Sequence, residues 1–114
     1  MILYLTKINE NISEDILDNR MSLLCSKRLE QALACKQQKD RIRSVFAGLL
    51  LQKGIEEWLF QKGEILSKDA NGRVLLEIEQ SKDGKPFLKD YPMLHYSISH
   101  SGDYVGCAFH DLPI

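Results

Sequence analysis

The sequence lacks both the basic excess of a nucleic-acid-binding protein and the long apolar run of a membrane span. Fifteen lysine and arginine residues stand against 16 aspartate and glutamate residues, so the formal net charge is −1. Proteins that bind nucleic acid by neutralising phosphates usually carry a surplus of positive charge. No stretch approaches the ~20 apolar residues of a transmembrane helix, and residues 1–7 have no basic leader. We therefore expect neither nucleic acid nor membrane as a partner.

Cysteine is also scarce, and its spacing is not that of a metal site. Cys25, Cys35 and Cys107 are an odd number of cysteines with no C-x-x-C pair among them. Structural zinc sites and disulfide frameworks need paired, regularly spaced ligands. We therefore expect no metal ligands here, and reduced, mostly buried thiols in a cytoplasmic protein.

What the chain does contain is the composition of one globular domain over residues 1–114, 44% hydrophobic and 27% charged. Residues 1–7 predict a strand, and Ser13 offers a helix N-cap before acidic residues. Apolar periodicity predicts a helix, whole or broken, over 14–34 and a second helix over 37–61. Alternation predicts a strand over 72–79. The order of these elements predicts an α+β fold, with helices packed on one face of an antiparallel sheet.

The most unusual stretch is the hairpin predicted over 95–109. Two apolar-alternating runs flank a polar turn, in which Gly102 can take a positive φ angle. His100 stands between Ser99 and Ser101 at the end of a strand that otherwise looks buried. This histidine could be a general base, a metal ligand, a phosphate donor or a polar cap of the hairpin. A catalytic triad is disfavoured because Asp103 lies across a tight turn.

Two other polar patterns are weak when each is taken alone. Gly84-Lys85-Pro86 could bring a backbone and a lysine to a phosphate, or could be an ordinary loop. The helices carry five basic residues that could hold a phosphate or could be solvated: Lys27, Arg28, Lys39, Arg41 and Arg43. Neither a Walker-type loop nor a strand-end pair of carboxylates is present.

Taken together and in order, these patterns resemble the Sfp-type 4′-phosphopantetheinyl transferases. The resemblance is carried by the helix at 40–51 with Arg43-Ser44, by Gly84-Lys85-Pro86, and by Tyr96-Ser97-Ile98-Ser99-His100-Ser101-Gly102. It implies one lobe of a two-lobed, pseudo-symmetric fold, here similar to the amino-terminal lobe. Members of this family transfer phosphopantetheine from coenzyme A to a serine of an acyl or peptidyl carrier protein, using Mg²⁺.

The resemblance implies a coenzyme A site in this chain. His100 would donate to a phosphate, Ser99 would lie beside the adenosine, and Gly84, Lys85 and Pro86 would line the base. Ser44 and Arg28 would hold the 3′-phosphate, with Arg43 beside them in the same wall. Arginine suits a compact dianion because it offers several convergent donors. Gln31 stands where some relatives have a second basic residue.

The sequence departs from the family pattern after the hairpin. Family members continue into G-[IV]-D-x-E, whose carboxylates bind Mg²⁺, and into W-x-x-K-E, whereas this sequence ends at Asp111-Leu112-Pro113-Ile114. No catalytic or metal-binding residue is therefore assigned, and we expect little activity from the chain alone. A complementary carboxy-terminal lobe or a second copy would be its partner. The alternatives are a non-catalytic module that binds coenzyme A or a carrier protein, and a self-associating truncated domain.

Overall fold

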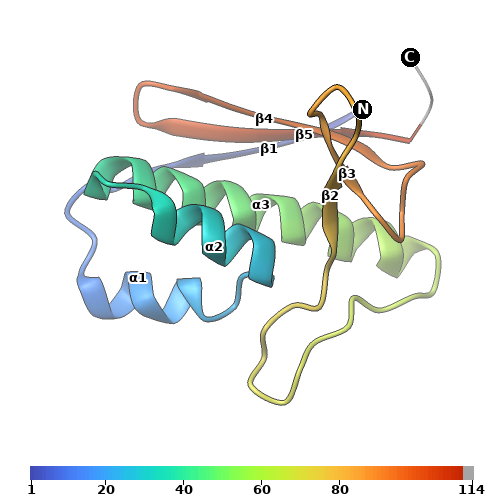
Figure 1. The fold of residues 1–114 in the computed structure, drawn as a ribbon, viewed down its shortest axis with the longest axis horizontal. Helices are drawn as coiled ribbons and strands as arrows, with labels where there is room; N and C mark the ends of the chain where they lie inside the picture. Colours follow the sequence, from blue (N-terminus) through green and yellow to red (C-terminus); the bar gives the residue numbers. More distant parts are fainter. Residues whose placement is uncertain (112–114) are drawn as a thin grey trace.

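The centre of the fold is a three-stranded antiparallel sheet. The computed structural model describes residues 1–111. Residues 112–114, at which the sequence departs from the family pattern, lie outside the described residues. The strands β1 (Ile2–Lys7), β4 (His95–Ser101) and β5 (Tyr104–His110) are arranged in the order β1-β5-β4 (Figure 1). The predicted first strand and the predicted terminal hairpin are therefore confirmed.

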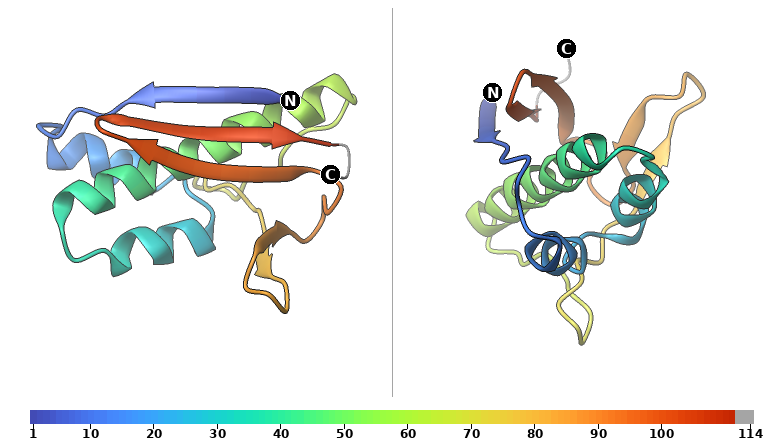
Figure 2. Two further views of the ribbon diagram at one scale, coloured as in Figure 1. Left: turned by 90° about the horizontal axis from the view of Figure 1, so that it is seen from above. Right: turned by 90° about the vertical axis from the view of Figure 1, so that its left-hand side faces the viewer.

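Three helices lie together on one face of this sheet. They are α1 (Glu14–Met21), α2 (Ser26–Ala34) and α3 (Gln38–Gln61). The long helix α3 lies between the sheet on one side and α1 and α2 on the other (Figures 1 and 2). The predicted cap is present, since the Ser13 hydroxyl accepts a hydrogen bond from the Ile16 N–H at 3.2 Å. The helix predicted over 14–34 is broken into two.

The strand predicted over 72–79 is mostly wrong. Only β2 (Ile78–Gln80) is a strand there, and it pairs with β3 (Pro86–Leu88) in a separate two-stranded sheet. Val74 and Leu76 are buried, as their alternation predicts, but Val74 forms no more than an isolated bridge with Lys68. The segment is an extended loop that packs its apolar side chains without a neighbouring strand.

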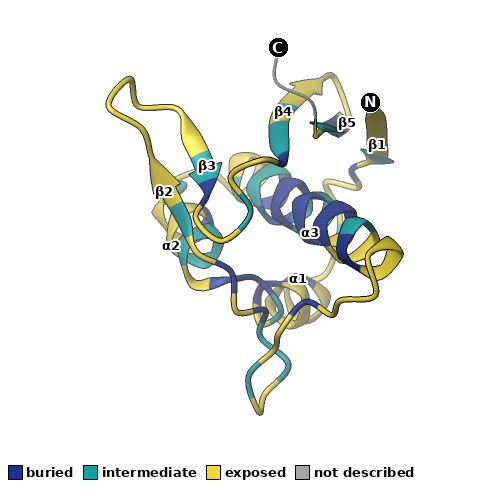
Figure 3. Ribbon diagram, turned by 90° about the vertical axis from the view of Figure 1, so that its right-hand side faces the viewer, coloured by how far each residue is buried: buried dark blue, intermediate teal, exposed yellow. Residues whose placement is uncertain are grey.

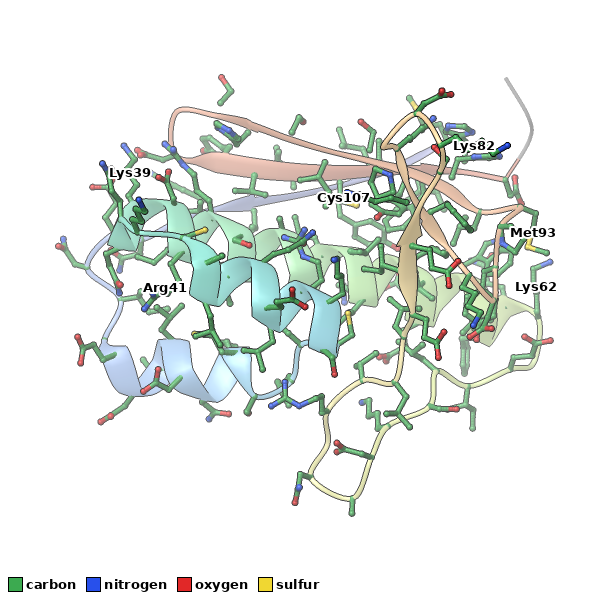
Figure 4. The ribbon with its side chains drawn as sticks, viewed as in Figure 1. Lys39, Arg41, Lys62, Lys82, Met93 and Cys107 are labelled. Carbon is green, nitrogen blue, oxygen red and sulfur yellow. The ribbon has the colours of Figure 1, made fainter. Side chains whose placement is uncertain are left out.

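The helix α3 contributes buried residues to both apolar clusters of the core. One cluster, around Leu51, Ile55 and Leu59, lies against the loop and strand residues of the second half of the chain. The other, around Ile42 and Val45, lies against α1 and α2. Figure 3 shows the buried residues concentrated along α3. Cys107 is fully buried on β5, between the sheet and α3 (Figure 4).

Two glycines in α3 allow close approaches to other elements. A Cβ at Gly48 would lie 2.7 Å from Leu24 Cδ2, and a Cβ at Gly54 would lie 2.1 Å from Phe109 Cε2. A glycine in mid-helix costs about 1 kcal/mol relative to alanine. The close contacts explain both glycines, because they leave no room for a Cβ atom. The close contact at Gly48 is with Leu24 and with Arg28 of α2, whereas Gly54 is the close contact between helix and sheet.

The face of the sheet opposite the helices is covered by none of the described helices (Figures 1 and 2). Leu3 and Leu5 on β1 are 62% and 61% exposed. They lie in register with small residues of β5, namely Ala108 and Gly106. Among the described residues, no helix is long and apolar enough to cross a membrane.

Candidate functional site

A cleft of about 270 Å³ opens where α2, the first half of α3 and β4 meet. We call it the basic cleft, because two arginines and a histidine lie in its wall. Its lining residues are Arg28, Asp40, Arg43, Ser44, Ala47, Ile98, Ser99, His100 and Val105. Residues from three separate parts of the chain therefore converge on one hollow.

A second hollow, of about 390 Å³, continues from the first towards the β2–β3 hairpin. We call it the adjoining groove, and its lining residues are Arg28, Gln31, Ile78, Lys85, Pro86, Tyr96, Ser97 and Ile98. Arg28 and Ile98 line both hollows. The two together form one extended surface, with Arg43 and His100 at the cleft end and Lys85 and Pro86 at the hairpin end.

Arg28 joins the two hollows and is held there by hydrogen bonds. Its Nη2 donates to the Ser44 carbonyl oxygen at 2.7 Å and lies 3.4 Å from Ser44 Oγ, and its Nη1 donates to Gln31 Oε1 at 2.9 Å. Its buried Nε has no hydrogen-bond partner among the described residues. A buried donor left unpaired costs free energy. The hydrogen bonds to Ser44 and Gln31 hold the guanidinium in place, so an anion that entered the cleft would meet a fixed cation.

Burial also changes the electrostatics of this guanidinium. Desolvation lowers the pKa of Arg28 below its ordinary value, because burial penalises the charged form, and the nearby Tyr96 opposes the shift. The missing Cβ of Gly48 allows the arrangement, since that atom would lie 3.1 Å from Arg28 Nε. A larger residue in this turn of α3 would displace the guanidinium.

Arg43 connects the start of α3 to the β4–β5 turn. Its Nη2 donates to the carbonyl oxygen of Gly102 at 3.4 Å, and its Nη1 lies 3.6 Å from the Asp40 carboxylate. Asp40 is in the cleft wall as well, so it offsets part of the positive charge. Arg43 thus adds a second cation to the wall of the basic cleft.

The residues of β4 present different faces to the cleft. Successive side chains of a strand point to opposite faces, and Ile98 packs on the helix side with the core, so His100 shares that side. The Ser99 hydroxyl lies on the other face, 3.6 Å from the position of a Cβ on Gly106. Ser99 therefore lies at the margin of the cleft, with its hydroxyl turned away from the helices.

The Gly84-Lys85-Pro86 stretch forms the hairpin between β2 and β3. Gly84 has a φ angle of 81°, and its N–H donates to the Ser81 carbonyl oxygen at 2.9 Å. Lys85 and Pro86 line the adjoining groove. Gly84 is exposed and lies outside both hollows, so it shapes the turn that brings Lys85 and Pro86 into place.

Of the other basic residues noted in the sequence, Lys27 lines neither hollow, and Lys39 and Arg41 serve local structure. Lys39 forms an ion pair with Glu10 at 3.0 Å. Arg41 donates to the carbonyl oxygens of Ala32 and Cys35 at the end of α2. Figure 4 shows Lys39 and Arg41 at the beginning of α3. The basic cluster suggested by the sequence is therefore divided, with Arg28 and Arg43 in the cleft.

Sequence reasoning did not assign Tyr96 or Asp40 to the site. Burial raises the pKa of Tyr96 to about 12, so this phenol stays neutral and can donate a hydrogen bond. Tyr96 is two residues before Ile98 in an alternating strand, and that spacing would have placed both on the helix side. No comparable sequence signal marks Asp40, because its position in the cleft wall depends on how α3 packs against β4.

The described residues offer no metal site. No group of three or more histidine, cysteine, aspartate or glutamate side chains within residues 1–111 lies close enough to hold an ion. Asp103 is exposed at the hairpin turn. A group of three or more ligands is needed to hold an ion by protein side chains alone, whereas Mg²⁺ usually binds through one or two carboxylates together with water and substrate phosphates.

Comparison with known proteins gives the context for this cleft. A scan against protein-family models finds no match. The chain is similar over its whole length to 4′-phosphopantetheinyl transferases. It is 26% identical over 115 residues to the 4′-phosphopantetheinyl transferase ffp of Bacillus subtilis, and 25% identical over 115 residues to the 4′-phosphopantetheinyl transferase Sfp of Bacillus subtilis (strain 168).

These identities indicate distant homology. Each match takes in 100% of this chain but 46% of the relative. The chain therefore spans about half the length of the curated relatives it matches. The α+β architecture, with small antiparallel sheets and helices, is compatible with a lobe of such an enzyme.

Proposed function

We propose that this chain supplies the coenzyme A-binding part of a 4′-phosphopantetheinyl transferase. The reaction would move phosphopantetheine from coenzyme A to a serine of an acyl or peptidyl carrier protein. The observation that carries the proposal is the position of Arg28, a held and partly unpaired cation at the junction of the two hollows. Distant homology to phosphopantetheinyl transferases over the full chain supports the same function.

The two hollows suit the two ends of a nucleotide. Arg28, Arg43, Ser44 and His100 would bind phosphate groups in the basic cleft, because charge-assisted hydrogen bonds are the strongest that side chains offer an anion. Lys85, Pro86 and Tyr96 would lie against the base in the adjoining groove. Gly84 would hold the turn, and Ser99 would contact the adenosine at the cleft margin.

The catalytic carboxylates would come from a complementary lobe. Mg²⁺ would neutralise charge that develops on the phosphate, and residues 1–111 bring together no group of three or more metal ligands. We therefore propose that the chain resembles the amino-terminal lobe and is inactive by itself. We further propose that the complementary lobe packs on the open face of the sheet and that the carrier protein binds the assembled enzyme.

Calorimetry with coenzyme A tests the binding step. We expect coenzyme A to bind, and dephospho-coenzyme A, which lacks the 3′-phosphate, to bind more weakly. His100→Ala should weaken binding about tenfold, the effect of losing one charge-assisted hydrogen bond. Arg28→Gln should weaken it by about 10- to 100-fold. Arg20→Gln, at an exposed position of α1 outside both hollows, is the matched control.

Equal affinity of the wild type, His100→Ala and Arg28→Gln for coenzyme A would remove the basic cleft from the site. Because Arg28 is partly buried, thermal melts of each variant must accompany the titrations. The exposed His100 makes its variant informative even where Arg28→Gln unfolds.

A non-catalytic coenzyme A module is the second candidate, and the lack of a metal site within residues 1–111 favours it. One experiment separates the transferase part from the binding module. This chain is mixed with the part of a Bacillus subtilis relative, ffp or Sfp, that it does not cover. Transfer to an apo-carrier protein in the presence of Mg²⁺ supports the transferase. Coenzyme A binding without transfer at any ratio supports the binding module.

A further inference from the structure

The strand β1 is an open edge of the three-stranded sheet, with backbone groups directed away from β5. The Ile8 N–H donates to the Asp103 carbonyl oxygen at 2.6 Å, next to the end of the β1–β5 ladder. Hydrogen-bonded residues alternate along an antiparallel ladder. The even-numbered residues of β1 therefore bond towards β5. The odd-numbered residues, Leu3, Leu5 and Lys7, turn their N–H and C=O groups to the open edge.

Over residues 2–6 this edge has none of the features that usually block strand pairing, and the one charged residue of β1, Lys7, stands at its end. Natural edge strands carry charges, prolines or bulges, yet residues 2–6 of β1 contain no charge, no proline and no glycine. The opposite edge of the sheet, β4, carries three exposed serines, Ser97, Ser99 and Ser101. β1 is thus the unprotected edge (Figure 2).

We propose that β1 pairs antiparallel with β1 of a second copy of this chain, about a two-fold axis at Tyr4. The two sheets would become one continuous six-stranded sheet. The backbone N–H and C=O groups that face the open edge must hydrogen-bond with each other across the two strands. Odd-numbered residues therefore pair with odd-numbered residues. With the axis at Tyr4, Leu3 lies opposite the partner's Leu5, and Leu5 opposite the partner's Leu3.

The side chains favour this register. Leu3 and Leu5 are 62% and 61% exposed on the outer face of the sheet, where Leu5 Cδ1 is 3.5 Å from the position of a Cβ on Gly106. Directly opposed side chains of antiparallel strands are neighbours. The register therefore gathers four leucines across the seam and buries apolar surface that the single chain exposes.

The charge nearest the proposed axis is neutralised within each chain. The Tyr4 hydroxyl donates to the Glu57 carboxylate, and Lys53 Nζ lies 3.5 Å from the same carboxylate group. Each copy therefore brings its own counter-charge to the axis. A self-complementary interface of this kind closes at two copies, so a dimer is expected, not a fibre.

Sedimentation equilibrium tests the dimer. The wild-type chain should approach twice its monomer mass as its concentration rises, and Leu5→Lys should stay monomeric at the same concentration. Leu33→Lys, at a residue of α2 that is 55% exposed, is the matched control and should still dimerise. A wild type that remains monomeric, or that forms species larger than two copies, would overturn the proposal.

Amide hydrogen exchange tests the register. The Leu3, Leu5 and Lys7 amides should gain protection as the wild type dimerises, whereas the Tyr4 and Thr6 amides, already bonded to β5, should not change. A dimer formed through the outer face of the sheet would leave the Leu3 and Leu5 amides unprotected and would contradict edge pairing. Coenzyme A plays no part in this experiment, so its result is separate from that of the calorimetry.

Discussion

Gln52 is a polar side chain buried in α3, where it holds the segment between α1 and α2. Its Oε1 accepts from the Cys25 N–H at 2.8 Å, and its Nε2 donates to the Leu23 carbonyl oxygen at 3.1 Å. These two bonds satisfy backbone groups at the break between the helices. The break also places α2, and with it Arg28, against the first half of α3.

Gln52→Leu should therefore be strongly destabilising for a single substitution. The change would leave the Cys25 N–H and the Leu23 C=O without partners, and each unsatisfied buried group costs about 1–3 kcal/mol. We expect the free energy of unfolding, measured with urea, to fall by at least ~2 kcal/mol. Gln61→Leu, at an exposed position of the same helix, should change it little. Equal effects of the two would contradict a structural role for the Gln52 hydrogen bonds.

A buried thiol and a buried phenol make the free energy of unfolding depend on pH in the alkaline range. Burial raises the pKa of the Cys107 thiol from 9.0 to about 12, and that of the Tyr96 phenol from 10.0 to about 12. The unfolded chain releases these protons at lower pH than the folded chain, so stability is full below pH 9 and is lost as pH rises towards 12.

Cys107→Ala should make the early part of this loss shallower. The variant lacks one of the two buried thiols, Cys107 and Cys25, whose raised pKa contributes to the decline above about pH 9, while Tyr96 and Tyr4 contribute above about pH 10. Urea unfolding at a series of pH values measures the slope. An unchanged slope in the variant would show that the buried thiol does not control alkaline stability.

Among the elements, α3 has the tightest contact with the sheet, at Gly54. A Cβ there would lie 2.1 Å from Phe109 Cε2 and 2.3 Å from Phe109 Cζ. Overpacking of this kind typically costs about 1–3 kcal/mol, so Gly54→Ala should lower the melting temperature despite the better helix propensity of alanine. Adding Phe109→Leu should restore part of the loss, because the smaller side chain makes room. Strictly additive losses in the double variant would contradict a direct clash.

The elements also show what the sequence could and could not predict. Periodicity located β1, α3 and the β4–β5 hairpin, and the Ser13 cap located the start of α1, because those signals are local. The alternation of Val74 and Leu76 predicted correctly which side chains turn inward. It could not show that no strand lies alongside them, because strand pairing depends on residues far away in the chain.

For the candidate site as well, local motifs could be predicted from the sequence, whereas contacts between distant elements could not. Motifs singled out Arg28, Ser44 and His100, which the structure places around one cleft. The role of Gly48 in accommodating Arg28, and the entry of Asp40 into the cleft, depend on how α2 and β4 pack on α3. A mid-helix glycine indicates close packing at Gly48 but not which residue it packs against, and Asp40 carries no local signal.

At the scale of the whole molecule, α3 makes the two apolar clusters one cooperative unit. Leu50 and Ile98 pack against both clusters. Leu59→Ala in the first cluster and Ile42→Ala in the second should each cost about 2–5 kcal/mol. Each should shift a single transition, seen at the same urea concentration by Trp58 fluorescence and by helical circular dichroism. Separate midpoints for the two signals would show that the clusters unfold independently.

The pairing of β1 with β5 has a consequence for how the fold is reached. Residues at the start of the chain gain their neighbours in the sheet from residues 104–109. During synthesis, β1 therefore waits for residues 104–109 to emerge before its ladder can close. Contacts so distant in sequence slow folding, and an apolar strand that waits unpaired is open to capture by other nascent chains. The β4–β5 hairpin, whose residues line the cleft, pairs locally, so the strand side of the cleft can form before β1 joins the sheet.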